Sequence, residues 1–167
     1  ASGGVGYAKA GGNYAASFYP TKKANKLGYD QILWTDVSND FTIEELGSAN
    51  FFFVNNGTLY TPELKDSILA GITRNSVIEL ARQKGMTVEE KRIKADDLKQ
   101  HLIDGNIDCM FATGTAASIT FVNKLTIDDD AFTVKSDEYQ PILDIKKLMD
   151  DIKFLDVPES FGWTVKV

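Results

Sequence analysis

The sequence predicts a mixed α/β fold in a single domain spanning residues 1–167. Apolar runs of strand length alternate with amphipathic helical patterns along the chain, and glycines follow several of those patterns. No internal repeat or low-complexity linker interrupts this alternation. The 43% hydrophobic and 25% charged content is ordinary for a globular domain that buries one core. The pattern leaves the topology open.

The first element predicted is a helix over residues 13–27. Gly28 follows it at the position where a glycine commonly ends a helix. Pro20 lies inside this segment, and we expect it to kink or restart the helix because proline has no backbone N–H to donate. Residues 31–35 come next, and their short apolar run predicts a buried strand.

A β-hairpin is predicted around Asn56-Gly57. Residues 51–55 and 58–60 consist mostly of residue types that are common in β-strands. Asn-Gly between two such runs is the strongest short-range signal for a two-residue hairpin turn. The rest of the chain alternates helical and extended patterns, and Gly85 ends the first of these helices. We expect helices at residues 73–84, 96–103 and 138–153, and extended segments at residues 87–93, 107–112, 118–122 and 161–167.

Charge and composition exclude several classes of function. The net charge is −6 and no stripe of Lys and Arg is present, so neither nucleic acid nor an anionic membrane is expected as a partner. No apolar run reaches the roughly 18 residues of a membrane span. A single cysteine forms no intrachain disulfide, which favours a reducing, cytoplasmic location. The first residues include no initiator Met and no signal region, and we expect the chain to begin partway through a longer protein.

No metal site is predicted. His101 is the only histidine and has no partners for a metal site or a catalytic triad. Cys109 lies in an apolar strand, where a free cysteine is usually a small buried hydrophobe. Asp128-Asp129-Asp130 lacks the spacing and the glycine of a calcium loop, which favours a solvated turn.

Three glycine-marked turns carry the residues that suggest chemistry. The first, residues 3–12, contains Lys9 among small residues, although its spacing is not that of a Walker phosphate loop. Such a lysine can form a Schiff base beside a planar ligand, or it can be an exposed lysine in a flexible loop. By itself this segment favours the flexible loop.

The other two turns suggest anion binding. Gly71-Ile72-Thr73 precedes a predicted helix, so its N–H groups and the Thr73 hydroxyl lie at the positive end of a helix dipole. Residues 113–117 follow a predicted strand, and Thr113 and Thr115 belong to a potential anion-binding concavity. An ordinary helix cap and a tight strand exit are the alternatives. A phosphorylated aldehyde cofactor needs both anion sites and an amine, so the three turns are more informative together.

Five motifs occur in an order and at a spacing that resemble the C-terminal region of branched-chain aminotransferases, which are fold-type IV enzymes dependent on pyridoxal 5'-phosphate (PLP). The resemblance covers nearly the whole chain and implies the pseudo-barrel C-terminal domain of that family. The motifs occupy residues 9–17, 31–34, 45–50, 69–74 and 114–117.

The resemblance implies a role for individual residues. Lys9 matches the lysine that holds PLP and moves the proton of the substrate. Tyr14 matches the tyrosine that hydrogen-bonds the phenolate oxygen of PLP, and Glu45 matches the carboxylate that faces the pyridine nitrogen. Ile72, Thr73 and Thr115 match phosphate ligands, while Ser48 and Ala116 match positions on the substrate side.

Three positions depart from the family pattern without removing a chemical group. Ala49 stands where Met is usual, Ala70 where Pro is usual, and Phe121 where Pro is common. The Cys-x-x-Cys of some members is also missing, so redox control of that type is not expected. The family's N-terminal domain, which supplies further groups to the phosphate and the substrate, has no counterpart in this sequence. We therefore expect this chain alone to hold PLP weakly and not to transaminate.

The implied activity belongs to the full-length parent. It is transamination between Leu, Ile or Val and 2-oxoglutarate by a homodimer. Another fold-type IV enzyme, such as a D-amino-acid aminotransferase or an aminodeoxychorismate lyase, is an alternative within the enzyme class. A non-catalytic fragment that acts as an interaction module is the alternative from another class.

Overall fold

A seven-stranded, mostly antiparallel sheet forms the centre of the protein. The computed structural model describes residues 3–116, 118–158 and 160–165. Strands β1 to β5 are adjacent in chain order, and β6 pairs with the other edge of β3 and with β7. Among the strand pairs of the described residues, only β4 and β5 run parallel to each other. The strands are β1 (Leu33–Asp36), β2 (Thr42–Leu46), β3 (Ala49–Asn55), β4 (Thr58–Pro62), β5 (Val88–Lys91), β6 (Ile107–Gly114) and β7 (Ser118–Phe121).

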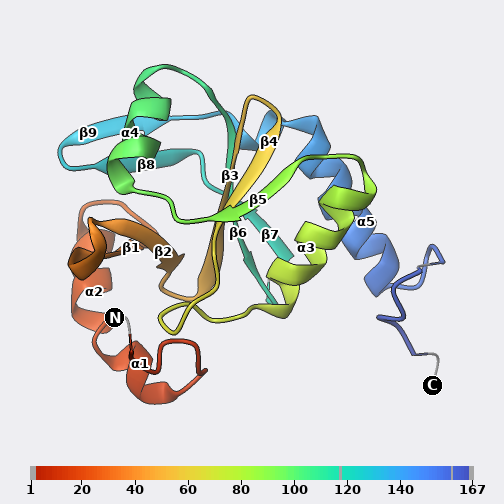
Figure 1. The fold of residues 1–167 in the computed structure, drawn as a ribbon, viewed down its shortest axis with the longest axis horizontal. Coiled ribbons are helices and arrows are strands. Elements are labelled where there is room, and N and C mark those ends of the chain that lie inside the picture. The colour runs from red at the N-terminus through yellow and green to blue at the C-terminus, as the bar shows by residue number, and fades with distance from the viewer. Residues whose placement is uncertain (1–2, 117, 159, 166–167) are drawn as a thin grey trace.

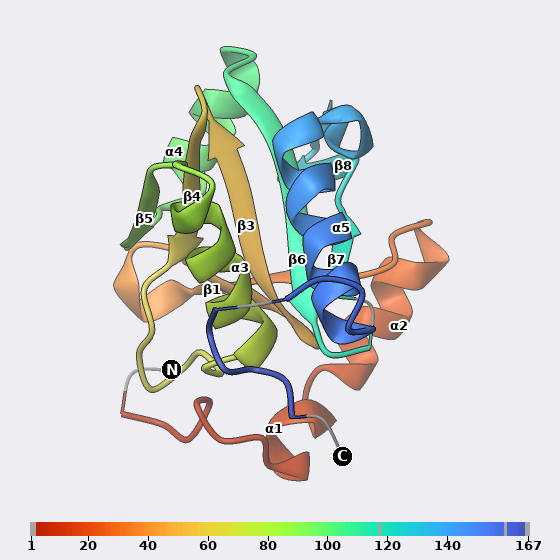
Figure 2. The same ribbon diagram turned by 90° about the vertical axis from the view of Figure 1, so that its right-hand side faces the viewer.

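Helices cover both faces of this sheet and confirm the predicted mixed α/β class. Helices α3 and α5 lie side by side on one face, while α4 and a two-stranded hairpin lie on the other (Figures 1 and 2). Two further helices, α1 and α2, lie at the N-terminal end of the chain (Figure 1). The remaining elements are α1 (Gly11–Ala15), α2 (Phe18–Lys26), α3 (Ile72–Gln83), α4 (Ala95–Ile103), α5 (Gln140–Lys153), β8 (Lys124–Ile127), β9 (Asp130–Thr133) and the 3₁₀ turns η1 (Val37–Asn39) and η2 (Ser136–Glu138).

Strand β3 is the centre of the core because it is buried on both faces. Side chains alternate along a strand, so Phe52 and Val54 pack under α3 and α5, while Phe51 and Phe53 pack toward α4. The ring of Phe52 stacks on that of Phe111 in β6, with the centroids 5.0 Å apart. A continuous apolar run is the pattern expected of a strand covered on both sides.

Several sequence predictions are confirmed. Asn55 pairs with Thr58 across the predicted hairpin, and both Asn56 and Gly57 have positive φ, as a type I′ turn requires. Helices α3, α4 and α5 begin and end within two residues of the predicted bounds. Gly85 has a φ of +81° just beyond α3, in the left-handed region that ends helices.

The predicted helix over residues 13–27 is wrong in its continuity. Two helices are present, and the break falls at Ala16 and Ser17, not at Pro20. Pro20 lies in the first turn of α2, where a missing N–H costs no intrahelical hydrogen bond. The Ser17 hydroxyl donates to the Tyr14 carbonyl at 2.7 Å and thereby supports the break.

Other differences concern strands. Strand β1 starts two residues later than predicted, and neither β2 nor the β8–β9 hairpin was predicted. Residues 160–165 contain no strand, and the rest of the predicted extended tail, residues 166–167, lies outside the described residues. Within the described part of the chain, no helix is long and apolar enough to cross a membrane. The same residues hold no cluster of three or more His, Cys, Asp or Glu suited to a metal ion.

Candidate functional site

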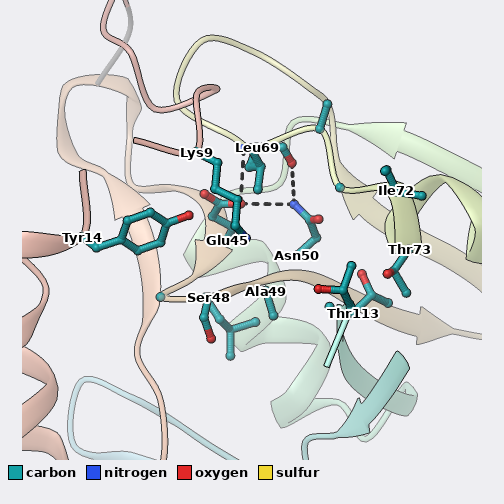
Figure 3. Close-up of a pocket in the computed structure, with 16 residues that line it drawn as sticks. Lys9, Tyr14, Glu45, Ser48, Ala49, Asn50, Leu69, Ile72, Thr73 and Thr113 are labelled. Carbon is teal, nitrogen blue, oxygen red and sulfur yellow. Dashed lines mark hydrogen bonds between the residues drawn. The ribbon is translucent and has the colours of Figure 1, made fainter. Parts of the chain in front are cut away.

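A cavity of about 240 Å³ opens where β2, β3 and β6 approach the loop that leads into α3 (Figure 3). Four segments that are far apart in the sequence contribute to its wall. The lining residues are Lys9 and Tyr14 from the N-terminal segment, residues 45–50 from β2, β3 and their turn, residues 69–73 from the start of α3, and residues 113–115 from the end of β6.

Sheet register aligns three polar side chains across the base of this cavity. Glu45 of β2 pairs with Asn50 of β3, and Asn50 pairs with Thr113 of β6. Residues that are directly opposite on neighbouring strands project to the same face of a sheet. Strand pairing therefore brings a carboxylate, an amide and a hydroxyl into one row.

The Glu45 carboxylate is half-buried and held by two donors. Its Oε2 accepts hydrogen bonds from Asn50 Nδ2 at 3.1 Å and from the Leu69 backbone N–H at 3.3 Å. Burial raises the pKa of Glu45 to about 7, and the negative charge of neighbouring Glu44 acts in the same direction. The Leu69 N–H and the positive charge of Lys9 oppose that rise in pKa. Glu45 is thus poised to gain or lose a proton near neutral pH.

The segment that carries Lys9 is fixed against the loop before α3. Tyr7 N–H donates to the Asp66 carbonyl at 3.0 Å, and a side chain at Gly6 would lie 2.7 Å from the Ser67 carbonyl oxygen. Gly6 is therefore required by this close approach. Asn13 closes the loop from within, because its Nδ2 donates to the carbonyls of Val5 and Ala8, both at 2.8 Å.

Lys9 itself is exposed and extends into the cavity beside Glu45 (Figure 3). Tyr14, which is half-buried on α1, points its hydroxyl toward the same space. The described residues place an amine, a phenol and a carboxylate of raised pKa around one end of the cavity.

Donors for an anion gather at the other end. Gly71 is the residue before α3, whose N-terminus has no side-chain cap, so the first N–H groups of the helix are available to a ligand. Thr73 lines the cavity at this end, and Thr113 is only 2% exposed. The Thr113 hydroxyl has no hydrogen-bond partner among the described residues. A buried hydroxyl without a partner is costly, and an anion bound here would accept its hydrogen bond.

Arg74 holds this end of α3 in place. Its Nη2 donates to the Pro62 carbonyl at 2.9 Å and to Glu90 Oε2 at 3.0 Å, so the buried guanidinium links the first turn of α3 to β4 and β5. The donor set suits a ligand with an anionic group at one end and a carbonyl and a basic nitrogen at the other.

Residues 6–125 match the sequence profile of the family described as Amino-transferase class IV. The chain belongs to the aminotransferase class IV family. A probable branched-chain-amino-acid aminotransferase of Staphylococcus aureus (strain N315) is 46% identical to it over 168 aligned residues. That alignment covers 99% of this chain and 46% of the relative, so the chain spans about half the length of the curated relatives it matches.

Solved structures of two branched-chain aminotransferases and of one lyase share the fold. The branched-chain aminotransferase of Escherichia coli is 31% identical, with a TM-score of 0.72 over 95% of this chain and 50% of that chain. A second branched-chain amino acid aminotransferase, solved in complex with N-(5'-phosphopyridoxyl)-L-glutamate, is 32% identical, with a TM-score of 0.77 over 95% of this chain and 49% of that chain. A putative 4-amino-4-deoxychorismate lyase of Legionella pneumophila is 26% identical, with a TM-score of 0.70 over 83% of this chain and 47% of that chain. The family resemblance and the fold-type IV architecture expected from the motifs are confirmed.

Seven of the eight site residues predicted from the sequence line the cavity. Ala116, expected near a substrate, is not among the described lining residues and is exposed on the turn after β6. Ala117, the last residue of that motif, lies outside the described residues. Ser48 and Thr115 line the cavity and are exposed, as are Lys9 and Ile72. The other five are Lys9, Tyr14, Glu45, Ile72 and Thr73.

Sequence reasoning assigned no role to Asn50 or Asn13, and it left Thr113 as one member of a potential anion site. Asn50 lies within the family motif at residues 45–50, and its pairing with Glu45 becomes evident only once β2 is recognised as a strand. Asn13 carries no local signal, because its two acceptors depend on the shape of the preceding loop.

Proposed function

We propose that this chain binds PLP in the cavity and forms the cofactor-binding domain of a branched-chain amino-acid aminotransferase. The observation that carries the proposal is the convergence of Lys9, Glu45 and the N-terminus of α3 on one cavity. PLP has an aldehyde, a pyridine nitrogen and a phosphate, and these three groups call for an amine, a carboxylate and anion donors respectively.

Lys9 supplies the primary amine through which the aldehyde is held covalently. When bound, PLP supplies a protonated ring that accepts the electron pair left as the Cα–H bond of an amino acid breaks. Lys9 Nζ would also be the base that takes the Cα proton of the amino acid and returns it to a neighbouring carbon. The loop held by Asn13 and Gly6 places this amine at the cavity.

Glu45 would face the pyridine nitrogen of PLP and keep it protonated. A positive charge beside the carboxylate favours its ionised form, so cofactor binding lowers the pKa of Glu45 from about 7. The ionised carboxylate would then favour the protonated ring nitrogen, which makes the ring electron-withdrawing. Tyr14, with its hydroxyl directed into the cavity, would donate a hydrogen bond to the phenolate oxygen of PLP.

The phosphate is assigned to the N-terminus of α3. The N–H groups of Ile72 and Thr73 and the Thr73 hydroxyl would hold it, and the hydroxyls of Thr113 and Thr115 would complete the set. The unpartnered Thr113 hydroxyl supports this placement from the structure itself.

The substrates are assigned with the help of the relatives' names. We propose Leu, Ile or Val as amino donor and 2-oxoglutarate as acceptor, with Ser48 and the Ala116 N–H on the substrate side. We also propose that this activity belongs to a cytoplasmic homodimer. Each subunit of that dimer would also contain a counterpart of the half of the relatives that this chain does not match. A relative that is 46% identical bears the branched-chain name, whereas the lyase structure is 26% identical, which favours the aminotransferase.

Titration of the purified chain with PLP tests the cofactor site. We expect a saturable absorbance change that is lost in Lys9→Ala and kept in Lys23→Ala, a matched exposed lysine on α2. An equal response from both variants would contradict the proposal. Assays of L-leucine, D-alanine and aminodeoxychorismate with the chain joined to the N-terminal half of a relative separate the three enzyme classes. Activity toward either of the last two alone would overturn the branched-chain assignment.

A further inference from the structure

Asn50 touches both ends of the cavity. Its side chain is buried at 5% exposure, and its Nδ2 donates to Glu45 Oε2 at 3.1 Å and to the Leu69 carbonyl at 2.9 Å. Leu69 in turn donates its N–H to the same Glu45 oxygen at 3.3 Å. Asn50, Glu45 and Leu69 therefore form a closed set of hydrogen bonds between β2, β3 and the loop that leads into α3 (Figure 3).

The other atom of the Asn50 amide fixes the identity of Gly71. A Cβ at Gly71 would lie 2.2 Å from Asn50 Oδ1, a distance that no real contact allows. The backbone of Gly71 has φ −68° and ψ 132°, which any residue adopts, so conformational freedom does not explain the glycine. Its only severe conflict among described atoms is with Asn50, because the next neighbour, Arg74 Cβ, lies at 3.4 Å.

We propose that Asn50 is a positioning residue that sets the Glu45 carboxylate and the turn before α3 at a fixed separation. The Glu45 carboxylate and the turn before α3, which would bind the two ends of one cofactor, are then held in a fixed relative position. The chemical meaning of this role depends on the proposed PLP site, but the structural coupling does not. A planar ligand held covalently in its middle tolerates little change in the distance between its two end partners.

The charged groups near the Glu45 carboxylate are few. Glu44 precedes it on β2 and faces Ser67 and Lys65, and Lys9 approaches from the cavity. Among the described lining residues, Lys9, Tyr14 and Glu45 are the ones with titratable side chains. A change in the titration of Glu45 after substitution at Asn50 thus reports on the hydrogen bond that was removed.

The first test follows the titration of Glu45 by NMR in the chain labelled at its glutamate carboxyls, without added PLP. Asn50→Leu removes the donor while filling similar space, so the pKa of Glu45 should rise by about one pH unit. Asn55→Leu is the matched control, because Asn55 is also a buried amide on β3 but does not line the cavity. It should leave Glu45 unchanged. Equal effects from both variants would mean that Asn50 is merely a core residue.

The second test is a double-mutant cycle with Gly71→Ala. In the wild-type background the new methyl should displace the Asn50 amide and raise the pKa of Glu45 in the same direction as Asn50→Leu. In an Asn50→Ala background the conflicting atom is gone, so Gly71→Ala should cause no further change. Equal effects of Gly71→Ala in both backgrounds would overturn the proposed coupling.

The affinity for PLP then connects the two proposals. We expect roughly tenfold weaker binding in Asn50→Leu and unchanged binding in Asn55→Leu. If the pKa of Glu45 changes as predicted but the chain binds no PLP, the proposed function is refuted and the role of Asn50 stands. If the chain binds PLP but the pKa of Glu45 does not change, the role of Asn50 is refuted and the proposed function stands.

Discussion

The raised pKa of Glu45 predicts a specific dependence of stability on pH. In the unfolded chain this carboxyl titrates near its ordinary value of 4.5, whereas burial raises its pKa to about 7 in the fold. Between these values unfolding releases a proton, so rising pH favours the unfolded state. Below pH 4.5 Glu45 is protonated in both states and does not lower the free energy of unfolding. As pH rises from 4.5 through 7, its buried charge lowers the free energy of unfolding.

The size of the effect follows from the difference between the two pKa values. At 1.36 kcal/mol per unit, a rise from 4.5 to about 7 corresponds to about 3.4 kcal/mol. Solvent reaches part of this half-buried carboxyl and screens it, so we expect about 1–2 kcal/mol. Glu45→Gln removes the titration and retains an oxygen that accepts from Asn50 and Leu69.

Urea unfolding from pH 4 to pH 8, followed by tryptophan fluorescence, measures this effect. The stability of Glu45→Gln minus that of the wild type should grow by about 1–2 kcal/mol across that range. Contributions from groups shared by both proteins cancel in the difference. Glu63→Gln, at an exposed position, serves as the control for the substitution itself. A flat difference for Glu45→Gln, or one that shrinks as pH rises, would refute the reasoning.

Three further predictions concern the ligand and the fold. Thr73→Val should weaken PLP binding roughly tenfold, since a hydrogen bond to a charged group contributes about 1.5 kcal/mol. Pyridoxal, which has no phosphate, should bind the variant and the wild type equally. An equal loss of affinity for both ligands would argue against a phosphate site. Phe111→Ala should lower the free energy of unfolding by about 3–5 kcal/mol in urea denaturation, because the ring is fully buried against Phe52, and a loss below 1 kcal/mol would contradict that packing. Gly57→Ala should cost about 1 kcal/mol because φ is +76° in the hairpin turn, and an unchanged melting curve would count against that turn geometry.

Local sequence signals predicted the elements whose cause is local. The Asn56-Gly57 turn and the glycine after α3 work through backbone conformations that few residues adopt, so both are readable without the fold. The same reasoning failed for the break between α1 and α2. The break was predicted at Pro20, but it lies at Ser17, whose hydroxyl donates a hydrogen bond to a backbone carbonyl.

Strand β2 was missed because its pattern depends on its neighbours. Residues 42–46 contain two adjacent glutamates, which break the alternation of apolar and polar side chains expected of a half-buried strand. In the structure Glu45 turns into the cavity, and Glu44 pairs with Lys65 at 3.2 Å. The β8–β9 hairpin was missed for a similar reason. Its acidic turn was interpreted as solvated, and Lys99 of α4 holds it through Asp128 and Asp130, both at 2.9 Å.

The site was predicted largely through the family resemblance and not through physical signals in the residues. Lys9 alone suggested an exposed loop lysine, and in the structure it is indeed exposed. Its significance comes from Glu45 and the α3 N-terminus, which lie 36 and 63 positions away in the sequence. Asn50 shows the limit of sequence reasoning most clearly, because both of its contacts depend on strand register and on a loop approaching from elsewhere.

Borohydride reduction of the chain with substoichiometric PLP, followed by peptide mass mapping, tests the central claim most directly. The chain contains many exposed lysines, and Lys9 is the one that lies in a cavity with a carboxylate at one end and anion donors at the other, as far as the described residues show. We predict that the phosphopyridoxyl label is found on Lys9 in large excess over every other lysine. Label spread evenly over the surface lysines would contradict a PLP site in this chain.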